Sequence, residues 1–246
     1  MFVDSHAHLF DDRIDLNQVD LANVDKILVP SYKMEHLGKV IQFCKTNSKF
    51  YPAIGVHPEY VADFNKDVFT NFVASNLKDI YAIGEIGLDT NYPNYLAQKD
   101  LFKFQLTIAK KYNLPVSVHL RGEVFSDFFA TIKDFNQKCV LHCFSGNERE
   151  LSTALDLGCY ISFATNITYK GNVALRKISS MVPDDRLLIE TDSPSMPPSG
   201  MRGKVNTSQN ILLVAETLAK VRGKTIEQIG LITSKNANKV FFKDKL

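Results

Sequence analysis

The chain opens with MFVDSHAHLF (residues 1–10), in which a short apolar run is followed by one aspartate and two histidines. The run over residues 2–4 predicts a buried strand, with Asp4 at its end and His6 and His8 just beyond it. Side chains two positions apart on extended backbone point the same way, so one metal ion can take both imidazoles. Ligand-type side chains at the carboxyl end of a buried strand are typical of α/β barrel enzymes.

The same pattern recurs along the chain, where short β-rich runs alternate with longer amphipathic segments. The predicted strands cover residues 2–4, 26–29, 51–55, 80–84, 116–118, 139–141, 160–163 and 186–189. This alternation predicts a parallel sheet with right-handed crossovers, and eight units fit a closed (β/α)8 TIM barrel of the α/β class. The alternative is an open doubly wound sheet, but no glycine-rich phosphate loop follows the first strand.

The clearest helical pattern spans residues 95–112, and similar patterns cover residues 125–135 and 148–157. Its apolar residues recur mostly every three to four positions and predict one buried face, made of Leu96, Leu101, Phe104, Ile108 and Tyr112. Two further helices are predicted at residues 208–221 and 225–240, packed outside the barrel. No linker or internal repeat interrupts the pattern, so we predict one domain over residues 1–246.

Composition and charge limit the classes of protein to which the chain can belong. Of its 246 residues, 45% are hydrophobic and 23% are charged, as in ordinary globular proteins. No apolar run is long enough to cross a membrane, and no signal peptide is evident. The four cysteines follow no secreted framework, which predicts reduced thiols and a cytoplasmic location. A net charge of +2 does not by itself indicate nucleic-acid binding, so a polyanionic substrate would need a local cluster of cations.

Polar side chains follow most of the predicted strands at one rim of the barrel, where active sites of this fold lie. Besides the first-strand residues, they are His57, Glu85, His119, His142 and Asp192, after strands three, four, five, six and eight. Five of the six histidines thus share one rim, and only His36 lies elsewhere. Two of these rim residues keep a second interpretation. Asp4 could be structural, and His57 could be either a catalytic residue or a loop residue packed on Pro58.

Imidazole and carboxylate ligands suit a divalent cation, and the number of ligands predicts two of them. His6, His8, Asp192 and one oxygen of Glu85 would hold the first ion, and the other Glu85 oxygen would hold the second with His119 and His142. A shared carboxylate would set the ions about 3.5–4 Å apart, a spacing used to activate water for hydrolysis. Asp192 could accept the proton from that water. Mg²⁺, Mn²⁺ and Zn²⁺ all remain open as the metal.

An ordered series of motifs resembles the TatD family of metal-dependent deoxyribonucleases, within the amidohydrolase-like barrel superfamily. The motifs are DSHAHL (4–9), GVHP (55–58), AIGEIGLD (82–89), LPVSVHLR (114–121), LHCFSG (141–146), GCYISF (158–163) and LLIETDSP (187–194). The resemblance implies that the family's metal ligands are His6, His8, Glu85, His119, His142 and Asp192, with Glu85 in place of the modified lysine of many superfamily relatives. It also implies 3′–5′ exonuclease action on single-stranded DNA.

The chain departs from the family after the last strand. Many members carry an R-N-E-P-like segment there, whereas this chain reads MRGKVNTSQN (201–210). Predicted substrate contacts are Arg121, Tyr169, Lys170 and Arg202, since cations grip phosphate and an aromatic ring such as Tyr169 or Tyr92 can stack on a base. DNA is therefore the predicted partner, with no membrane; the oligomeric state is open, a monomer included.

Two other functions remain as alternatives. The same barrel and metals could hydrolyse an amide, ester or lactone bond of a small molecule. A metal-bound scaffold could also bind nucleic acid without cutting it, although the presence of all six metal ligands argues against a decayed site.

Overall fold

Eight parallel strands form one sheet in the computed structural model, which describes residues 1–242. The strands pair in chain order and are β1 (Phe2–Asp4), β2 (Val24–Pro30), β3 (Phe50–Ile54), β4 (Ala82–Asp89), β5 (Val116–Arg121), β6 (Cys139–Leu141), β7 (Tyr160–Phe163) and β8 (Leu187–Ile189). The seam between the first and last strands is bridged where Ser5 N donates to Ile189 O at 3.1 Å. The predicted (β/α)8 barrel is thereby confirmed.

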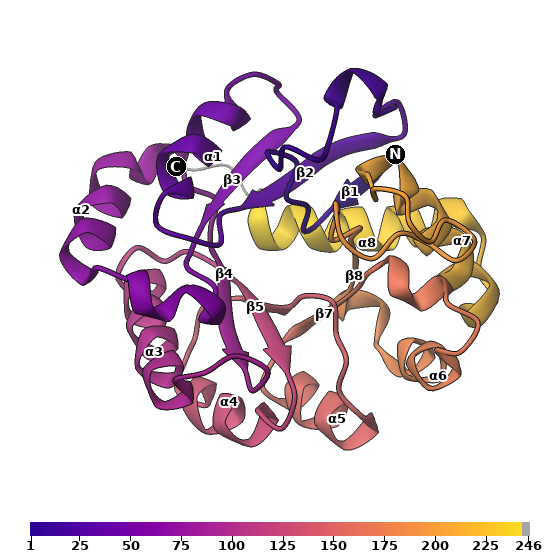
Figure 1. Cartoon of the computed structure of the whole chain (residues 1–246). Helices are drawn as coiled ribbons and strands as arrows, with labels where there is room; N and C mark the ends of the chain where they lie inside the picture. Colours follow the sequence, from indigo (N-terminus) through magenta and orange to yellow (C-terminus); the bar gives the residue numbers. More distant parts are fainter. Residues whose placement is uncertain (243–246) are drawn as a thin grey trace.

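An α-helix follows each strand from β2 to β8, whereas only the 3₁₀ turn Leu16–Gln18 follows β1, and the helices surround the sheet, as Figure 1 shows. They are α1 (His36–Cys44), α2 (Lys66–Asn76), α3 (Tyr95–Lys111), α4 (Phe125–Ile132), α5 (Glu148–Asp156), α6 (Val173–Met181), α7 (Ile211–Arg222) and α8 (Ile226–Phe241). The last two confirm the predicted C-terminal helices, although residues 208–210 form a separate 3₁₀ turn. Within residues 1–242, no helix combines the length and the apolar character that crossing a membrane requires.

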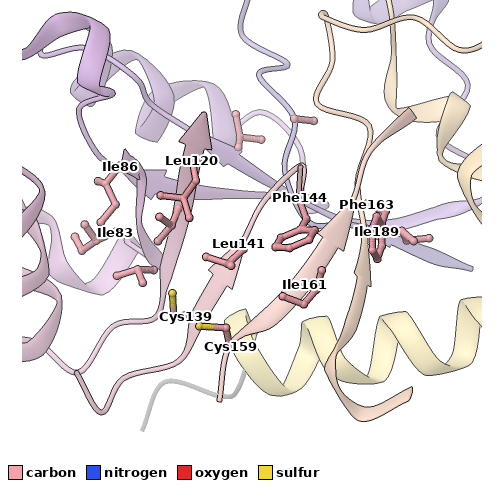
Figure 2. Close-up of a cluster of buried hydrophobic side chains, with 14 of the residues drawn as sticks. Ile83, Ile86, Leu120, Cys139, Leu141, Phe144, Cys159, Ile161, Phe163 and Ile189 are labelled. Atoms are coloured by element: carbon pink, nitrogen blue, oxygen red, sulfur yellow. The ribbon is translucent and has the colours of Figure 1, made fainter. Parts of the chain in front are cut away.

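The two faces of each strand pack against different partners, because successive side chains alternate between them. In β2, Ile27 and Val29 belong to the larger buried cluster, whereas Leu28 belongs to a separate one. Figure 2 shows part of the larger cluster, with labelled side chains from β4 to β8. The separate cluster joins residues of six other strands to the C-terminal half of α8: Val3, Ala53, Ala82, Val140, Tyr160, Leu188, Ala237, Val240 and Phe241.

Helix α8 covers the amino end of the barrel. The Asn236 side chain donates to the backbone oxygens of Asp184 and Leu187, at 2.7 and 2.9 Å, directly beside the start of β8. A capping box at Thr225 fixes the first turn of this helix, since the Thr225 and Gln228 side chains each bond the other's backbone N–H. With its amino end closed by apolar packing, the barrel presents its polar residues at the carboxyl ends of the strands.

The buried face of α3 differs from the predicted one. Leu96 was predicted to lie on this face but is 77% exposed, and two glutamines are fully buried instead. Gln105 bonds both backbone groups of Val56, with its Oε1 accepting from the N–H at 2.8 Å and its Nε2 donating to the carbonyl at 3.0 Å. Gln98 bonds both backbone groups of Asp89 in the same way. The face of α3 that is buried is therefore the one that carries Gln98 and Gln105, which bond backbone groups near the ends of two strands. Apolar periodicity alone does not predict such a face.

Strands β4 and β5 are longer than predicted, so Glu85 and His119 lie within these strands and not after their ends. Glu85 is in the middle of β4, where the pairing with β5 shifts register between Ile83 and Ile86. Such an irregularity can re-aim a side chain. Gly87 has φ +153°, and a Cβ atom there would lie 1.9 Å from the His119 carbonyl oxygen. Only glycine therefore allows β4 to approach His119 so closely.

We expect Gln105→Ala to lower the free energy of unfolding by about 2–4 kcal/mol, because the buried N–H and C=O of Val56 lose their partners. Urea denaturation measures this change. Gln42→Ala makes the same exchange at an exposed position of α1 and should change stability by less than about 0.5 kcal/mol. Equal stabilities of the two variants would show that the Gln105 amide does not support the strand end.

Candidate metal centre

Five imidazoles meet around one carboxylate at the open end of the barrel. The Glu85 side chain is almost fully buried, and its two oxygens face different histidines. The Oε2 atom lies 3.2 Å from His8 Nε2 and 3.6 Å from His6 Nε2. The Oε1 atom lies 2.9 Å from His142 Nε2, 3.0 Å from His119 Nδ1 and 3.8 Å from His57 Nε2. The two oxygens therefore divide the imidazoles into two groups.

Asp192 adds a second carboxylate to the group that contains His6 and His8. Its Oδ1 lies 3.9 Å from Nε2 of each of these histidines. The backbone at Asp192 is left-handed, with φ +53°, and its N–H donates to His6 O at 3.0 Å. Aspartate tolerates this backbone region better than most residues do. The turn after β8 thereby brings the carboxylate back toward the histidines that follow β1.

The donor atoms are close enough together to share metal ions. Three groups have their ligand atoms within 4.8 Å of one another: His6 with His142 and Asp192, His6 with His8 and Glu85, and His57 with Glu85 and His119. Imidazole nitrogens and carboxylate oxygens suit borderline or hard divalent cations such as Zn²⁺ or Mn²⁺. The donor set thus fits a divalent metal centre. The assignment of individual ligands to individual ions stays a prediction.

Each of these histidines also has a partner for its second ring nitrogen. His6 Nδ1 lies 3.0 Å from Ser117 Oγ, and His8 Nδ1 lies 3.1 Å from Pro30 O. The other three partners are Asp89 Oδ2 at 3.0 Å from His119, Glu190 Oε1 at 3.3 Å from His142, and the Glu59 N–H donating to His57 at 3.2 Å. Such partners fix the orientation of metal-binding imidazoles.

Sequence reasoning did not single out Ser117, Asp89 or Glu190. Asp89 and Glu190 lie inside the motifs AIGEIGLD and LLIETDSP, and Ser117 lies two residues before His119. Glu190 is fully buried, and besides His142 it accepts a bond of 2.6 Å from the Cys143 N–H. Strand alternation was the available signal, because Ser117 and His119 lie two apart, as do Glu190 and Asp192.

The charges in the cluster shift the pKa values of its members in opposite directions. Burial opposes ionisation of Glu85, but the charge of protonated His142 and the hydrogen bonds from His119 and His142 hold its pKa well below the usual range. Burial likewise opposes protonation of His142, yet the charge of Glu85 and the bond to Glu190 raise its pKa to about 10. Burial dominates at His57 and lowers its pKa to about 3, which leaves this imidazole neutral.

Two buried polar residues near the cluster stabilise the loop after β8. Asp4 accepts from the Thr191 N–H at 2.9 Å and from the Thr191 hydroxyl at 2.6 Å, which supports the structural interpretation of this aspartate. The Asn206 amide donates to the backbone oxygens of Thr191 and Ser195, both at 2.8 Å. Asn206, which lies in the segment MRGKVNTSQN where the chain departs from the family pattern, therefore holds the loop in place.

A cavity of about 300 Å³ opens beside the cluster, and its lining differs from the predicted substrate contacts. Its described lining includes His8, His57, Glu85, His119 and Asp192, but none of the predicted contacts Arg121, Tyr169, Lys170 and Arg202. The lining also includes Asp11, Arg13, Tyr32, Glu59, Tyr60 and Tyr92. Of these six residues, the sequence analysis considered only Tyr92.

The predicted contacts lie outside this cavity. Arg121 is half-buried and donates to Leu120 O at 2.8 Å and to Ser145 Oγ at 3.1 Å. Burial opposes its charge, but Cys143, Asp192 and Glu85 together raise its pKa, so its guanidinium lies in the field of the cluster. Lys170 and Arg202 are exposed, and Tyr169 is half-buried. Their substrate roles stay predictions.

Comparison with known proteins places the chain among metal-dependent hydrolases. The profile of a family described as TatD related DNase matches residues 3–242. The chain is 30% identical over 254 residues to the Bacillus subtilis (strain 168) protein named uncharacterized metal-dependent hydrolase YabD, with 98% of this chain and 99% of that protein covered. It is 32% identical over 198 residues to a Pantoea ananatis protein named 3'-5' ssDNA/RNA exonuclease TatD, with 76% of each covered.

A solved structure has the same fold. The crystal structure of YjjV, a TatD homologue from Escherichia coli K12, matches this chain with a TM-score of 0.90 and 27% identity. The match covers 99% of this chain and 98% of that one. The barrel and its two additional C-terminal helices therefore follow an architecture already seen in a TatD homologue.

We expect Glu190→Gln to lower the His142 pKa of the metal-free protein from about 10 by about one unit or more, because a buried negative charge is removed. An NMR titration of the His142 ring measures it. Because folding raises the His142 pKa, protonated His142 stabilises the folded protein. This contribution is fully present below pH 6.5 and is lost as pH rises through about 10. The exposed exchange Glu123→Gln is the control; an unchanged His142 midpoint in Glu190→Gln would contradict the assigned contact.

Proposed function

Because the chain belongs to the TatD-related DNase family of metal-dependent hydrolases, we propose that it is a deoxyribonuclease that uses two divalent metal ions. Its substrate is single-stranded DNA, from which it removes nucleotides in the 3′–5′ direction. The name of the Pantoea ananatis relative supports this direction and strand preference. The cytoplasm is the proposed compartment, on the cysteine spacing of the sequence.

The observation that carries the proposal is the division of imidazoles by the two oxygens of Glu85. His6, His8 and Asp192 would hold one ion on the Oε2 side, and His119 and His142 would hold the other on the Oε1 side. Two such ions, when bound, supply Lewis-acid polarisation of a phosphoryl oxygen and lower the pKa of a water to near neutrality. A carboxylate between two groups of imidazoles is an arrangement that can hold a pair of ions close together.

The chain's own residues then move the proton and position the substrate. Asp192 would accept the proton of the attacking water, since its carboxylate lies beside the cluster and its side chain is 13% exposed. His57 would assist as a neutral imidazole that faces Glu85 and His119. Arg121 would bind a phosphate next to the scissile bond, with Tyr169, Lys170 and Arg202 farther along the strand.

The alternative is a hydrolase of small-molecule amides, esters or lactones, and one observation favours it. The cavity beside the cluster is small, and its described cation, Arg13, is already paired with Asp11 through bonds of 2.8 Å from both Nε and Nη2. Two assays separate the functions. Single-stranded oligonucleotides and a panel of amides, esters and lactones are each supplied with Mg²⁺, Mn²⁺ or Zn²⁺. Turnover of the small molecules alone would exclude the nuclease.

We expect Asp192→Asn to reduce turnover of a single-stranded oligonucleotide by about 100-fold or more while the melting temperature changes little, because proton transfer loses its acceptor. Nucleotide release is measured with the metal-loaded protein. Asp134→Asn, an exposed exchange just after the end of α4, should retain wild-type turnover. Normal activity in Asp192→Asn would remove this residue from the mechanism.

We expect Arg121→Ala to weaken oligonucleotide binding and to reduce the slope of log K against log salt by about 0.7, the value for one phosphate contact on a single strand. Binding is measured by fluorescence anisotropy at several salt concentrations. Arg149→Ala removes an exposed arginine from α5 and serves as the matched control. If the two variants share the wild-type slope, Arg121 does not contact phosphate.

A further inference from the structure

Three tyrosines from consecutive loops line one wall of the cavity beside the metal centre. Tyr32 follows β2, Tyr60 lies in the 3₁₀ helix Pro58–Asp63 after β3, and Tyr92 follows β4. We propose that this wall is a subsite for the terminal nucleoside of the substrate strand, with the base packed against the tyrosine rings. The proposal rests on the nuclease function given above and specifies which part of the strand enters the cavity.

The rings are arranged as a wall and not as a closed stack. The Tyr32 and Tyr60 centroids lie 5.8 Å apart at an angle of 42°, and Tyr92 meets His57 edge to face at 5.8 Å. All three tyrosines are half-buried, and all three line the cavity. Aromatic side chains bind the bases of single strands by stacking, whatever the base, because every base has a π-face.

The size of the cavity limits what can enter it. Its volume of about 300 Å³ lies at the lower end of the range for small-molecule sites. That space suits one base with its sugar, not a run of stacked nucleotides. Because the cavity also includes Glu85, His119 and Asp192, a nucleoside held there places its linking phosphate beside the metal ligands. One nucleotide would then leave in each turnover.

The charges of this wall favour a terminal hydroxyl over a terminal phosphate. Asp11 and Glu59 both line the cavity, and Asp11 already holds Arg13 through two bonds of 2.8 Å. A phosphate entering here would meet carboxylates and a cation that is already paired, and like charges in contact are unfavourable. Arg121 lies outside the cavity lining, where the remaining phosphates of the strand would run. The bound strand therefore has its terminal hydroxyl in the cavity and its remaining phosphates on the side of Arg121.

The first experiment compares two oligonucleotides of one sequence, the second of which ends in a 3′ abasic analogue. With wild-type protein and Mn²⁺, we expect KM to be about tenfold higher for the abasic end, the effect of losing one base–aromatic stack. Tyr60→Ala should raise KM about tenfold for the normal end and leave the abasic KM within about twofold. Tyr60→Phe keeps the ring and should retain the wild-type KM for both ends.

Two further variants protect this comparison against a folding defect. Tyr92→Ala removes a ring from a different loop and should repeat the pattern of Tyr60→Ala. Tyr112→Ala removes a half-buried tyrosine at the end of α3, away from the cavity, and should leave both KM values unchanged. Two results would overturn the subsite. One is a rise in KM that is equal for the normal and the abasic 3′ end, and the other is an unchanged KM for the normal end in both Tyr60→Ala and Tyr92→Ala.

The second experiment tests the carboxylates with an oligonucleotide that carries a 3′ phosphate. We expect the wild type to cut it several-fold more slowly than the 3′ hydroxyl form, and Glu59→Gln to narrow that difference. Equal rates on the two ends would overturn the proposed selection for a hydroxyl. If the wild type releases nucleotides but ignores the terminal base, only the subsite fails. If no oligonucleotide is cut with any metal, the proposed nuclease fails and the subsite fails with it.

Discussion

The structure depends on how one buried carboxylate is balanced. Glu85 is 5% exposed in the middle of a strand, and a charge so placed is costly unless it is paired. Five imidazoles lie 2.9 to 3.8 Å from its oxygens and supply the compensation. Those imidazoles come from segments spread between β1 and β6, so the barrel must close before the charge is satisfied. The same arrangement provides the donors for a metal centre. The positions of these residues that stabilise the fold are therefore also the positions that metal binding requires.

The rest of the barrel holds that arrangement in place. Apolar side chains and helix α8 close the amino end. Ser117, the Pro30 carbonyl and Glu190 contact the second ring nitrogens of three histidines and orient them. A second kind of support comes from α3, whose buried glutamines bond the backbone after β3 and at the end of β4. These contacts lie between elements distant in the chain. Together they fix the orientation of the imidazole rings, which a metal centre requires for its geometry.

The open end of the barrel is asymmetric. Loops after β1 to β4 bring tyrosines and carboxylates to the cavity, whereas β5 and the loop after β7 carry Arg121, Tyr169 and Lys170 outside it. In the nuclease proposed above, the first group would take the terminal base and the second would take the phosphates of the strand. In this fold, the loops after the strands decide specificity while the strands fix the chemistry.

The sequence by itself determined the alternation of strands and helices, the gathering of five histidines at one rim and the membership of a hydrolase family, because strand periodicity and residue chemistry are local properties. It placed Leu96 on the wrong face of its helix, ended β4 before Glu85 and did not find Glu190 or most of the tyrosine wall. Only the tertiary structure decided those features. A glutamine that bonds a distant backbone, a register shift between two strands and a cavity between loops each depend on segments brought together by the closing of the barrel, and no local pattern records which segments will meet.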